Sequence, residues 1–173
     1  QNNSGGSYAG GGIHLSVAAK LEVTDSTIAE NNAQYYGGGI NVSGGNLRLI
    51  RTKVAKNNAS GGSGMYVQST SGRTSTISLS DNTEICENNT TGYGGGIYTY
   101  PLAKDAIINM TIQDSSIYNN EAATGAGIFA YSNFKNTLDV SIQSGSKLYD
   151  NETSGLGGAI YAKNATLAIN QNA

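Results

Sequence analysis

The feature that constrains this chain most is a short phrase of small residues, mostly glycine, that ends in one apolar residue and recurs along the sequence. In chain order its copies are GGGI at 10–13 and 37–40, GSGM at 62–65, GGGI at 94–97, GAGI at 125–128 and LGGAI at 156–160. The apolar residues that close them are Ile13, Ile40, Met65, Ile97, Ile128 and Ile160, so successive copies are 27, 25, 32, 31 and 32 residues apart. A period of this size predicts a solenoid, in which the chain returns to the same place once per turn.

A second marker lies between these phrases, where an apolar residue is followed three positions later by asparagine. The asparagines of this marker are Asn31, Asn57, Asn88, Asn120 and Asn151. A short segment with apolar residues at every second position precedes each marker, as at Leu47/Leu49 and Ile77/Leu79. This alternation predicts strands with one buried face. Leu, Glu and Lys are scarce while β-branched residues are frequent, which favours strands over helices.

These patterns together predict an all-β fold, a right-handed single-stranded parallel β-helix of about 5–6 rungs with three short strands in each. We expect residues 1–173 to form a single domain that is either a segment of a longer repeat protein or a unit that stacks end to end. The asparagine column is expected to form an internal ladder of hydrogen-bonded amides. Opposite charges are expected to meet on adjacent rungs, Asp25 with Arg51 and Lys53 with Glu84.

Composition and motifs argue against several classes of function. The net charge is −2 with 13% charged residues, so no basic stripe for nucleic acid is present. No run of 18 apolar residues exists, so no helix of this segment is expected to span a membrane. The polysaccharide enzymes of this fold need paired carboxylates. The candidates are Asp150 with Glu152 and the group Asp81, Glu84 and Glu87, for which a solvated face is the favoured interpretation. We therefore expect no catalytic residue, metal or cofactor, with a degenerate polysaccharide-active enzyme as the second alternative.

The two markers resemble the GGA(I/L/V) and FxxN repeats of chlamydial polymorphic outer-membrane proteins and related bacterial surface adhesins. Residues 157–160 read GGAI and match the first repeat as written, whereas the second keeps its asparagine and replaces Phe by Ile, Val or Leu. The resemblance covers nearly the whole chain. It implies a right-handed β-helix of autotransporter-like type on a cell surface, engaged in adhesion.

An aromatic column is the feature that a repeat of this kind does not require. The residue after each closing apolar residue is predicted to point out of the solenoid, and this column reads His14, Asn41, Tyr66, Tyr98, Phe129 and Tyr161. Two positions further along their strands, Tyr100 and Tyr131 are predicted to face the same way. The connections that follow these strands lengthen on three rungs, at 69–76, 101–107 and 132–137. Insertions in a solenoid often mark its binding face.

The sequence therefore predicts a solvent-exposed ligand-binding surface formed by six aromatic residues and the three flanking loops. These residues are Tyr66, Tyr98, Tyr100, Phe129, Tyr131 and Tyr161. The alternative is that stacked rings only stabilise a strand face. On the binding hypothesis, replacing Tyr98 and Phe129 by alanine abolishes binding while the fold survives.

The predicted function is that of a non-enzymatic extracellular protein at the cell surface, which adheres to a glycan or a protein on a host or neighbouring cell. The first alternative is a structural subunit of an extracellular fibre or sheath. It rests on the absence of an obvious capping helix at either end, since open solenoid ends expose unpaired strand edges.

Overall fold

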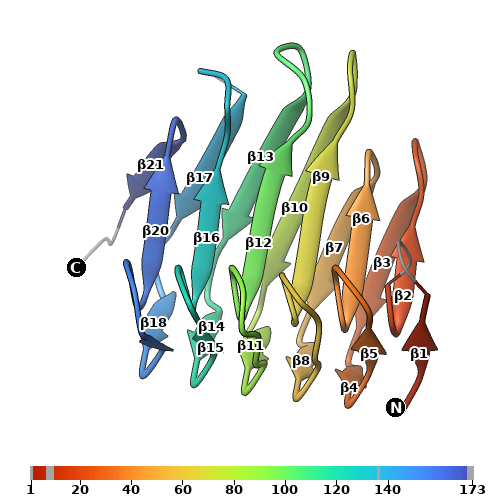
Figure 1. Ribbon diagram of the computed structural model, residues 1–173, viewed down its shortest axis with the longest axis vertical. Coiled ribbons are helices and arrows are strands. Elements are labelled where there is room, and N and C mark those ends of the chain that lie inside the picture. Colours follow the sequence, from red (N-terminus) through yellow and green to blue (C-terminus); the bar gives the residue numbers. More distant parts are fainter. Residues whose placement is uncertain (1, 7–9, 136, 171–173) are drawn as a thin grey trace.

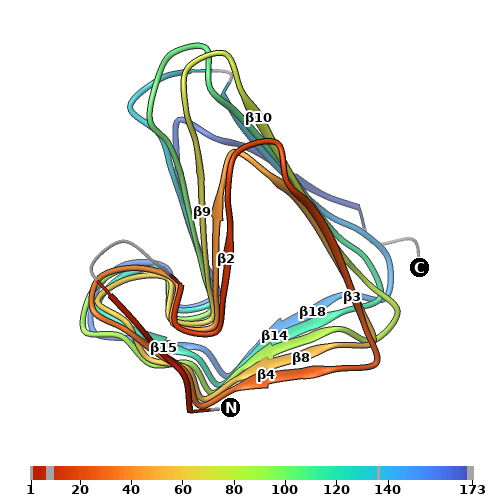
Figure 2. The same ribbon diagram turned by 90° about the vertical axis from the view of Figure 1, so that its right-hand side faces the viewer.

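The chain folds as a right-handed parallel β-solenoid of about 5 turns. A computed structural model describes residues 2–6, 10–135 and 137–170, and all of its regular elements are strands. Figure 1 shows the rungs side by side in chain order, and Figure 2 looks along the solenoid, so that equivalent strands superimpose. In this described part of the chain, nothing forms a helix that is long and apolar enough to cross a membrane.

Three parallel sheets enclose the core, and each rung contributes one strand to each sheet. Sheet 1 contains β2 (Ile13–Leu15), β6 (Ile40–Ser43), β9 (Met65–Ser69), β12 (Ile97–Pro101), β16 (Ile128–Tyr131) and β20 (Ile160–Lys163). Sheet 2 contains β3 (Lys20–Thr24), β7 (Asn46–Ile50), β10 (Thr74–Ser80), β13 (Ile107–Ile112), β17 (Leu138–Ile142) and β21 (Thr166–Ile169). Sheet 3 contains β4 (Thr27–Ala29), β8 (Lys53–Ala55), β11 (Glu84–Cys86), β14 (Ser116–Tyr118) and β18 (Lys147–Tyr149).

The register of sheet 1 is the one that the glycine phrase predicts. Each closing apolar residue begins a strand, and Met65 pairs with Ile40 on one side and with Ile97 on the other. Met65 and Ile97 are fully buried, as are Ile77 of sheet 2 and Ile85 of sheet 3. The core is therefore a stack of Ile, Leu, Val and Met side chains, and each fully buried one contributes about 1.5–3 kcal/mol.

Left-handed backbone conformations form the corners between the sheets. From the second phrase onward the first glycine has a positive φ, such as +70° at Gly37 and +64° at Gly94. The residue directly before the ladder asparagine also lies in this region without being glycine, with φ of +55° at both Lys56 and Glu87. A non-glycine residue pays about 1–2 kcal/mol for this conformation. The asparagine that follows compensates for that cost.

The asparagines form a continuous amide ladder inside this corner. Each side-chain nitrogen donates to the side-chain oxygen on the next rung: Asn31 to Asn57, Asn57 to Asn88 and Asn88 to Asn120, each at 3.0 Å, and Asn120 to Asn151 at 2.9 Å. The same oxygens also accept the backbone N–H of the preceding asparagine. Asn31, Asn57, Asn88 and Asn120 are at most 2% exposed, so these polar groups are buried and satisfied together.

The charged columns meet as the register requires. Arg51 Nε lies 2.6 Å from Asp25 Oδ1, and Lys53 Nζ lies 3.2 Å from Glu84 Oε2. The hydrogen bond from Arg51 holds the pKa of Asp25 below its usual value. All these side chains are exposed to solvent, so the ion pairs contribute little to stability. Their value here is as evidence that the rungs are aligned in the predicted register.

A lobe beside sheet 1 is the part of the fold that the repeat does not predict. On each rung, the chain between the ladder asparagine and the glycine phrase makes an excursion, which appears in Figure 2 as the bulge beside the strands of sheet 1. Successive excursions are joined by parallel pairing of β1 (Ser4–Gly5) with β5 (Asn32–Ala33) and of β15 (Glu121–Ala122) with β19 (Glu152–Thr153). Isolated bridges such as Gly61 to Tyr93 continue the stack. The lobe and sheet 1 together form a concave angle along the solenoid.

Candidate functional site

The aromatic column points away from the core, into the angle between sheet 1 and the lobe. Tyr66, Tyr98 and Phe129 form a buried cluster that is separate from the main core. The ring centroids of Tyr66 and Tyr98 are 5.1 Å apart, as are those of Tyr98 and Phe129, and both pairs meet edge to face. Tyr161 stacks on Phe129 at 4.9 Å. These geometries are favourable for aromatic pairs.

The prediction that this column is presented to solvent is wrong for its central members. Tyr66, Tyr98 and Phe129 are 4%, 9% and 6% exposed. The lobe covers them, because Tyr36 stacks on Tyr66 at 4.5 Å and Tyr93 stacks on Phe129 at 4.7 Å. The three rings are therefore the floor of a site, and its accessible surface belongs to other residues.

Tyr36 and Tyr93 were not identified from the sequence. Both stand immediately before the first glycine of a phrase, in Tyr-Gly-Gly-Gly-Ile at 36–40 and 93–97. Tyr36 pairs with Gly61 and Gly61 pairs with Tyr93 across the rungs, so they belong to one column of the lobe. Their shared position before the glycine phrase is a signal in the sequence that the two tyrosines are equivalent. It does not show that the lobe folds back against sheet 1.

Phe129→Ala is expected to lower the free energy of unfolding by about 3 kcal/mol, because it opens a cavity beneath Tyr93, Tyr98 and Tyr161. Urea unfolding followed by circular dichroism measures the effect. Tyr149→Ala is the matched control, since this ring is 43% exposed on sheet 3, and there we expect a loss of less than about 1 kcal/mol. Equal losses for the two variants would contradict the buried role of Phe129.

Two adjacent hollows follow the floor along the solenoid, and we call them together the aromatic groove. The first has a volume of about 240 Å³ and is lined by Tyr36, Asn41, Tyr66, Gln68, Tyr98, Tyr100 and Leu102. The second has a volume of about 390 Å³ and is lined by Tyr93, Tyr98, Thr124, Phe129, Tyr131, Leu156 and Tyr161. Tyr98 lines both hollows, so they adjoin each other along the direction of the rungs.

Two of the three lengthened connections contribute residues to this groove or its rim. Asn133 in the third connection donates to the hydroxyl of Tyr100 at 2.8 Å and accepts from the hydroxyl of Tyr131 at 2.7 Å. Leu102 in the second connection lines the first hollow. Lys163 lies over the ring of Tyr131, with its Nζ 5.3 Å from the ring centroid. One loop residue thus orients two rings at the rim.

The groove is uncharged. None of the side chains that line the two hollows is acidic or basic. Burial raises the pKa of Tyr66 and of Tyr98 far above the ordinary value of a phenol, since the ionised form would lose its hydration. Both rings therefore stay neutral at physiological pH, and the site presents aromatic faces, hydroxyls and amides.

Asn41 is an exception to the satisfied polar groups around the groove. Its side chain is 3% exposed and lines the first hollow. The side-chain oxygen Oδ1 is buried, and within the described part of the chain no donor lies within hydrogen-bond distance of it. Buried acceptors without a partner are rare in folded proteins, so this one needs an explanation.

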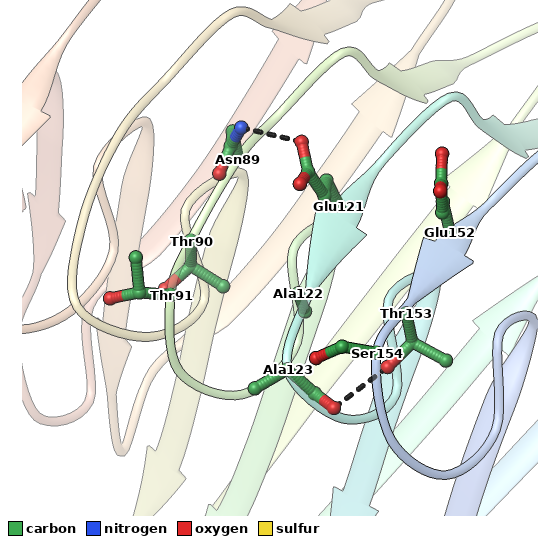
Figure 3. A pocket seen from close by; sticks show the side chains of 9 residues that line it. All are labelled: Asn89, Thr90, Thr91, Glu121, Ala122, Ala123, Glu152, Thr153 and Ser154. Atoms are coloured by element: carbon green, nitrogen blue, oxygen red, sulfur yellow. Dashed lines mark hydrogen bonds between the residues drawn. The ribbon is translucent and has the colours of Figure 1, made fainter.

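A third hollow, of about 340 Å³, lies on the lobe and holds the most prominent carboxylates (Figure 3). Glu121 and Glu152 are register partners on adjacent rungs, and Asn89 Nδ2 donates to Glu121 Oε2 at 2.8 Å. Figure 3 shows the two carboxylates side by side on one wall. Glycoside hydrolysis needs carboxyl groups on either side of the scissile bond. Within residues 2–6, 10–135 and 137–170, no group of three or more His, Cys, Asp or Glu side chains could hold a metal ion.

The other candidates for chemistry are occupied in structural contacts. Glu84 and Glu87 each form an ion pair with a lysine of the preceding rung, Lys53 and Lys56. The thiol of Cys86 is buried in sheet 3, and this burial raises its pKa. A reactive cysteine needs the opposite shift.

Comparisons with protein-family models, with curated proteins and with solved structures find no match to this chain. The two markers behind the resemblance to surface adhesins have a structural explanation within this molecule. The glycines form corners and the asparagines form the ladder. The two markers leave the aromatic groove unexplained.

Proposed function

We propose that the chain is a non-enzymatic extracellular protein of the adhesin type, and that it binds a ligand on another cell in the aromatic groove. The observation that carries the proposal is the groove itself, two adjoining hollows with a buried aromatic floor and an accessible aromatic and apolar rim. At this rim Tyr93 is 49%, Leu102 45% and Leu156 65% exposed. Clustered exposed apolar groups of this kind mark interaction sites.

The division into floor and rim supports a binding role. Tyr66, Tyr98 and Phe129 are held by neighbouring rings, so they provide a rigid base for the groove. Tyr100, Tyr131 and Tyr161 remain partly exposed and are packed against that base. A ligand would therefore meet side chains that are already ordered, which lowers the entropic cost of binding.

Tyr93→Ala and Tyr131→Ala are each expected to weaken binding to cells about 10-fold, because tyrosines that contact a partner are often among the residues that contribute most to affinity. Fluorescently labelled protein, titrated against a panel of bacterial, fungal and animal cells, measures this by flow cytometry. Tyr149→Ala is again the control, because it removes a half-exposed tyrosine from sheet 3, away from the groove. Cell binding that all three variants retain unchanged would refute the groove as the site, provided that their melting temperatures match.

A further inference from the structure

The chemistry of the groove narrows the ligand class, if the proposed function holds. A charged ligand would have to leave water for a groove whose lining side chains carry no charge. That desolvation is costly when no opposite charge receives it. The nearby cation of Lys163 is engaged with the ring of Tyr131. The ligand is therefore expected to be uncharged.

The polar groups of the first hollow favour a ligand that carries hydroxyl groups. Gln68 donates to Ser43 at 2.9 Å and accepts from the hydroxyl of Tyr66 at 3.4 Å, so its amide already has partners. Asn41 Oδ1 has none. The final torsion of an asparagine side chain is soft, so rotation about it on binding can bring this oxygen to the hollow that the side chain lines. A purely apolar ligand would leave the acceptor unsatisfied, whereas a hydroxyl group would donate to it.

The shape of the groove suits a chain rather than a single ring. Its lining extends from Asn41 on β6 to Tyr161 on β20, which are four rungs apart. With ~4.8 Å between neighbouring strands, this distance is roughly 19 Å. A pyranose ring in an extended oligosaccharide advances by about one such spacing, and its C–H face packs on aromatic rings while its hydroxyls reach amides and phenols.

We infer that the aromatic groove binds an uncharged oligosaccharide of about four pyranose residues, laid along the solenoid axis, with a sugar hydroxyl donating to Asn41 Oδ1. Tyr98 lies at the middle of the bound chain, since it lines both hollows. The rim tyrosines pack on the sugar faces.

Titration with neutral linear oligosaccharides tests this inference. The probes are gluco-, xylo-, manno- and galacto-oligosaccharides of one to six residues, in α- and β-linked series. The chain has 11 tyrosines and no tryptophan, so tyrosine fluorescence reports the rings directly, with calorimetry alongside. For at least one series, affinity is expected to rise with length and to level off at about four residues. If no series binds, or if a charged glycan or a peptide binds in their place, the inference is overturned.

Asn41→Leu is the decisive variant, because it separates binding from folding. Since Oδ1 has no partner in the free protein, the melting temperature is expected to stay the same or to rise, while affinity for the oligosaccharide falls about 10-fold. Asn109→Ala, an exposed asparagine on sheet 2, is the matched control and should change neither quantity. Unchanged affinity in Asn41→Leu overturns the role of Asn41. If Tyr93→Ala and Tyr131→Ala still weaken cell binding in that case, the proposed function stands and only the ligand assignment fails.

Discussion

Asn88→Ala is expected to lower the free energy of unfolding by about 5 kcal/mol, one of the two largest effects that we expect of a single substitution in this chain. The amide oxygen of Asn88 accepts two hydrogen bonds from Asn57, one from its backbone nitrogen and one from Nδ2, both at 3.0 Å. Its Nδ2 donates to Asn120 Oδ1 at 3.0 Å and to the Val54 carbonyl at 3.1 Å. Alanine leaves the buried backbone N–H of Asn57 without its acceptor, at about 1–3 kcal/mol, and removes three further buried hydrogen bonds, at about 0.5–1.5 kcal/mol each. Asn57 Nδ2 keeps the Ile28 carbonyl as a partner, and Asn120 Oδ1 keeps the N–H of Asn88. Urea unfolding followed by circular dichroism measures the loss.

Asn89→Ala is the natural control for this experiment. Asn89 is the next residue along the chain, but its side chain is exposed and donates only to Glu121. We expect a change of less than about 1 kcal/mol, as for most surface substitutions. If Asn88→Ala cost no more than Asn89→Ala, the ladder would not be a source of stability.

The solenoid was predictable because it repeats each environment several times within one chain. Met65 shows why: a single methionine among isoleucines is ambiguous, but its position in the period assigns it to the column of Ile40 and Ile97, where it lies fully buried. The same repetition placed Arg51 above Asp25 and aligned the asparagines of the ladder. In a parallel stack each residue lies beside the equivalent residue of the next rung, so the period of the sequence predicts which residues pair within the sheets.

The candidate site was only partly predictable. Two-residue alternation correctly directed Tyr66, Tyr98 and Phe129 out of the core, because side chains alternate between the faces of a strand. Alternation does not say what covers an outer face. Tyr36 and Tyr93 of the lobe cover these rings. They lie in segments that have no two-residue alternation, and the corners before and after these segments decide how they return to sheet 1. The burial of the aromatic column therefore depends on a tertiary contact with another segment, and a local sequence pattern carries no information about such a contact.

The two sequence markers also turn out to be physically coupled. In the first five phrases the third small residue lies against the ladder asparagine that follows it in the chain, so that a Cβ on Gly64 would lie 2.9 Å from Nδ2 of Asn88. Gly39 has the same relation to Asn57, also at 2.9 Å, and Gly96 to Asn120 at 3.2 Å. Glycine is needed here for space, because a methyl group would occupy the volume of the amide. Phrase and ladder therefore recur with the same period because they pack against each other.

Gly64→Ala is accordingly expected to lower the free energy of unfolding by about 4 kcal/mol, above the usual range for overpacking, because the new methyl group meets groups that have no room to move. Its Cβ would lie 2.5 Å from the backbone oxygen of Gly96 as well as against the Asn88 amide. Gly72→Ala is the control: φ there is +66° and nothing lies within 4 Å of the new Cβ, so only the conformational cost of about 1–2 kcal/mol is expected.

The double variant Gly64→Ala/Asn88→Ala shows whether the two markers act as one unit. The methyl group of Gly64→Ala displaces the amide that Asn88→Ala removes, so part of the loss is common to both changes. We expect the double variant to lose at least 1 kcal/mol less than the sum of the single losses, as residues in direct contact do. Additive losses would mean that the methyl group acts only through the backbone oxygen of Gly96. In that case the shared period of glycine and asparagine would reflect two separate requirements of the rung.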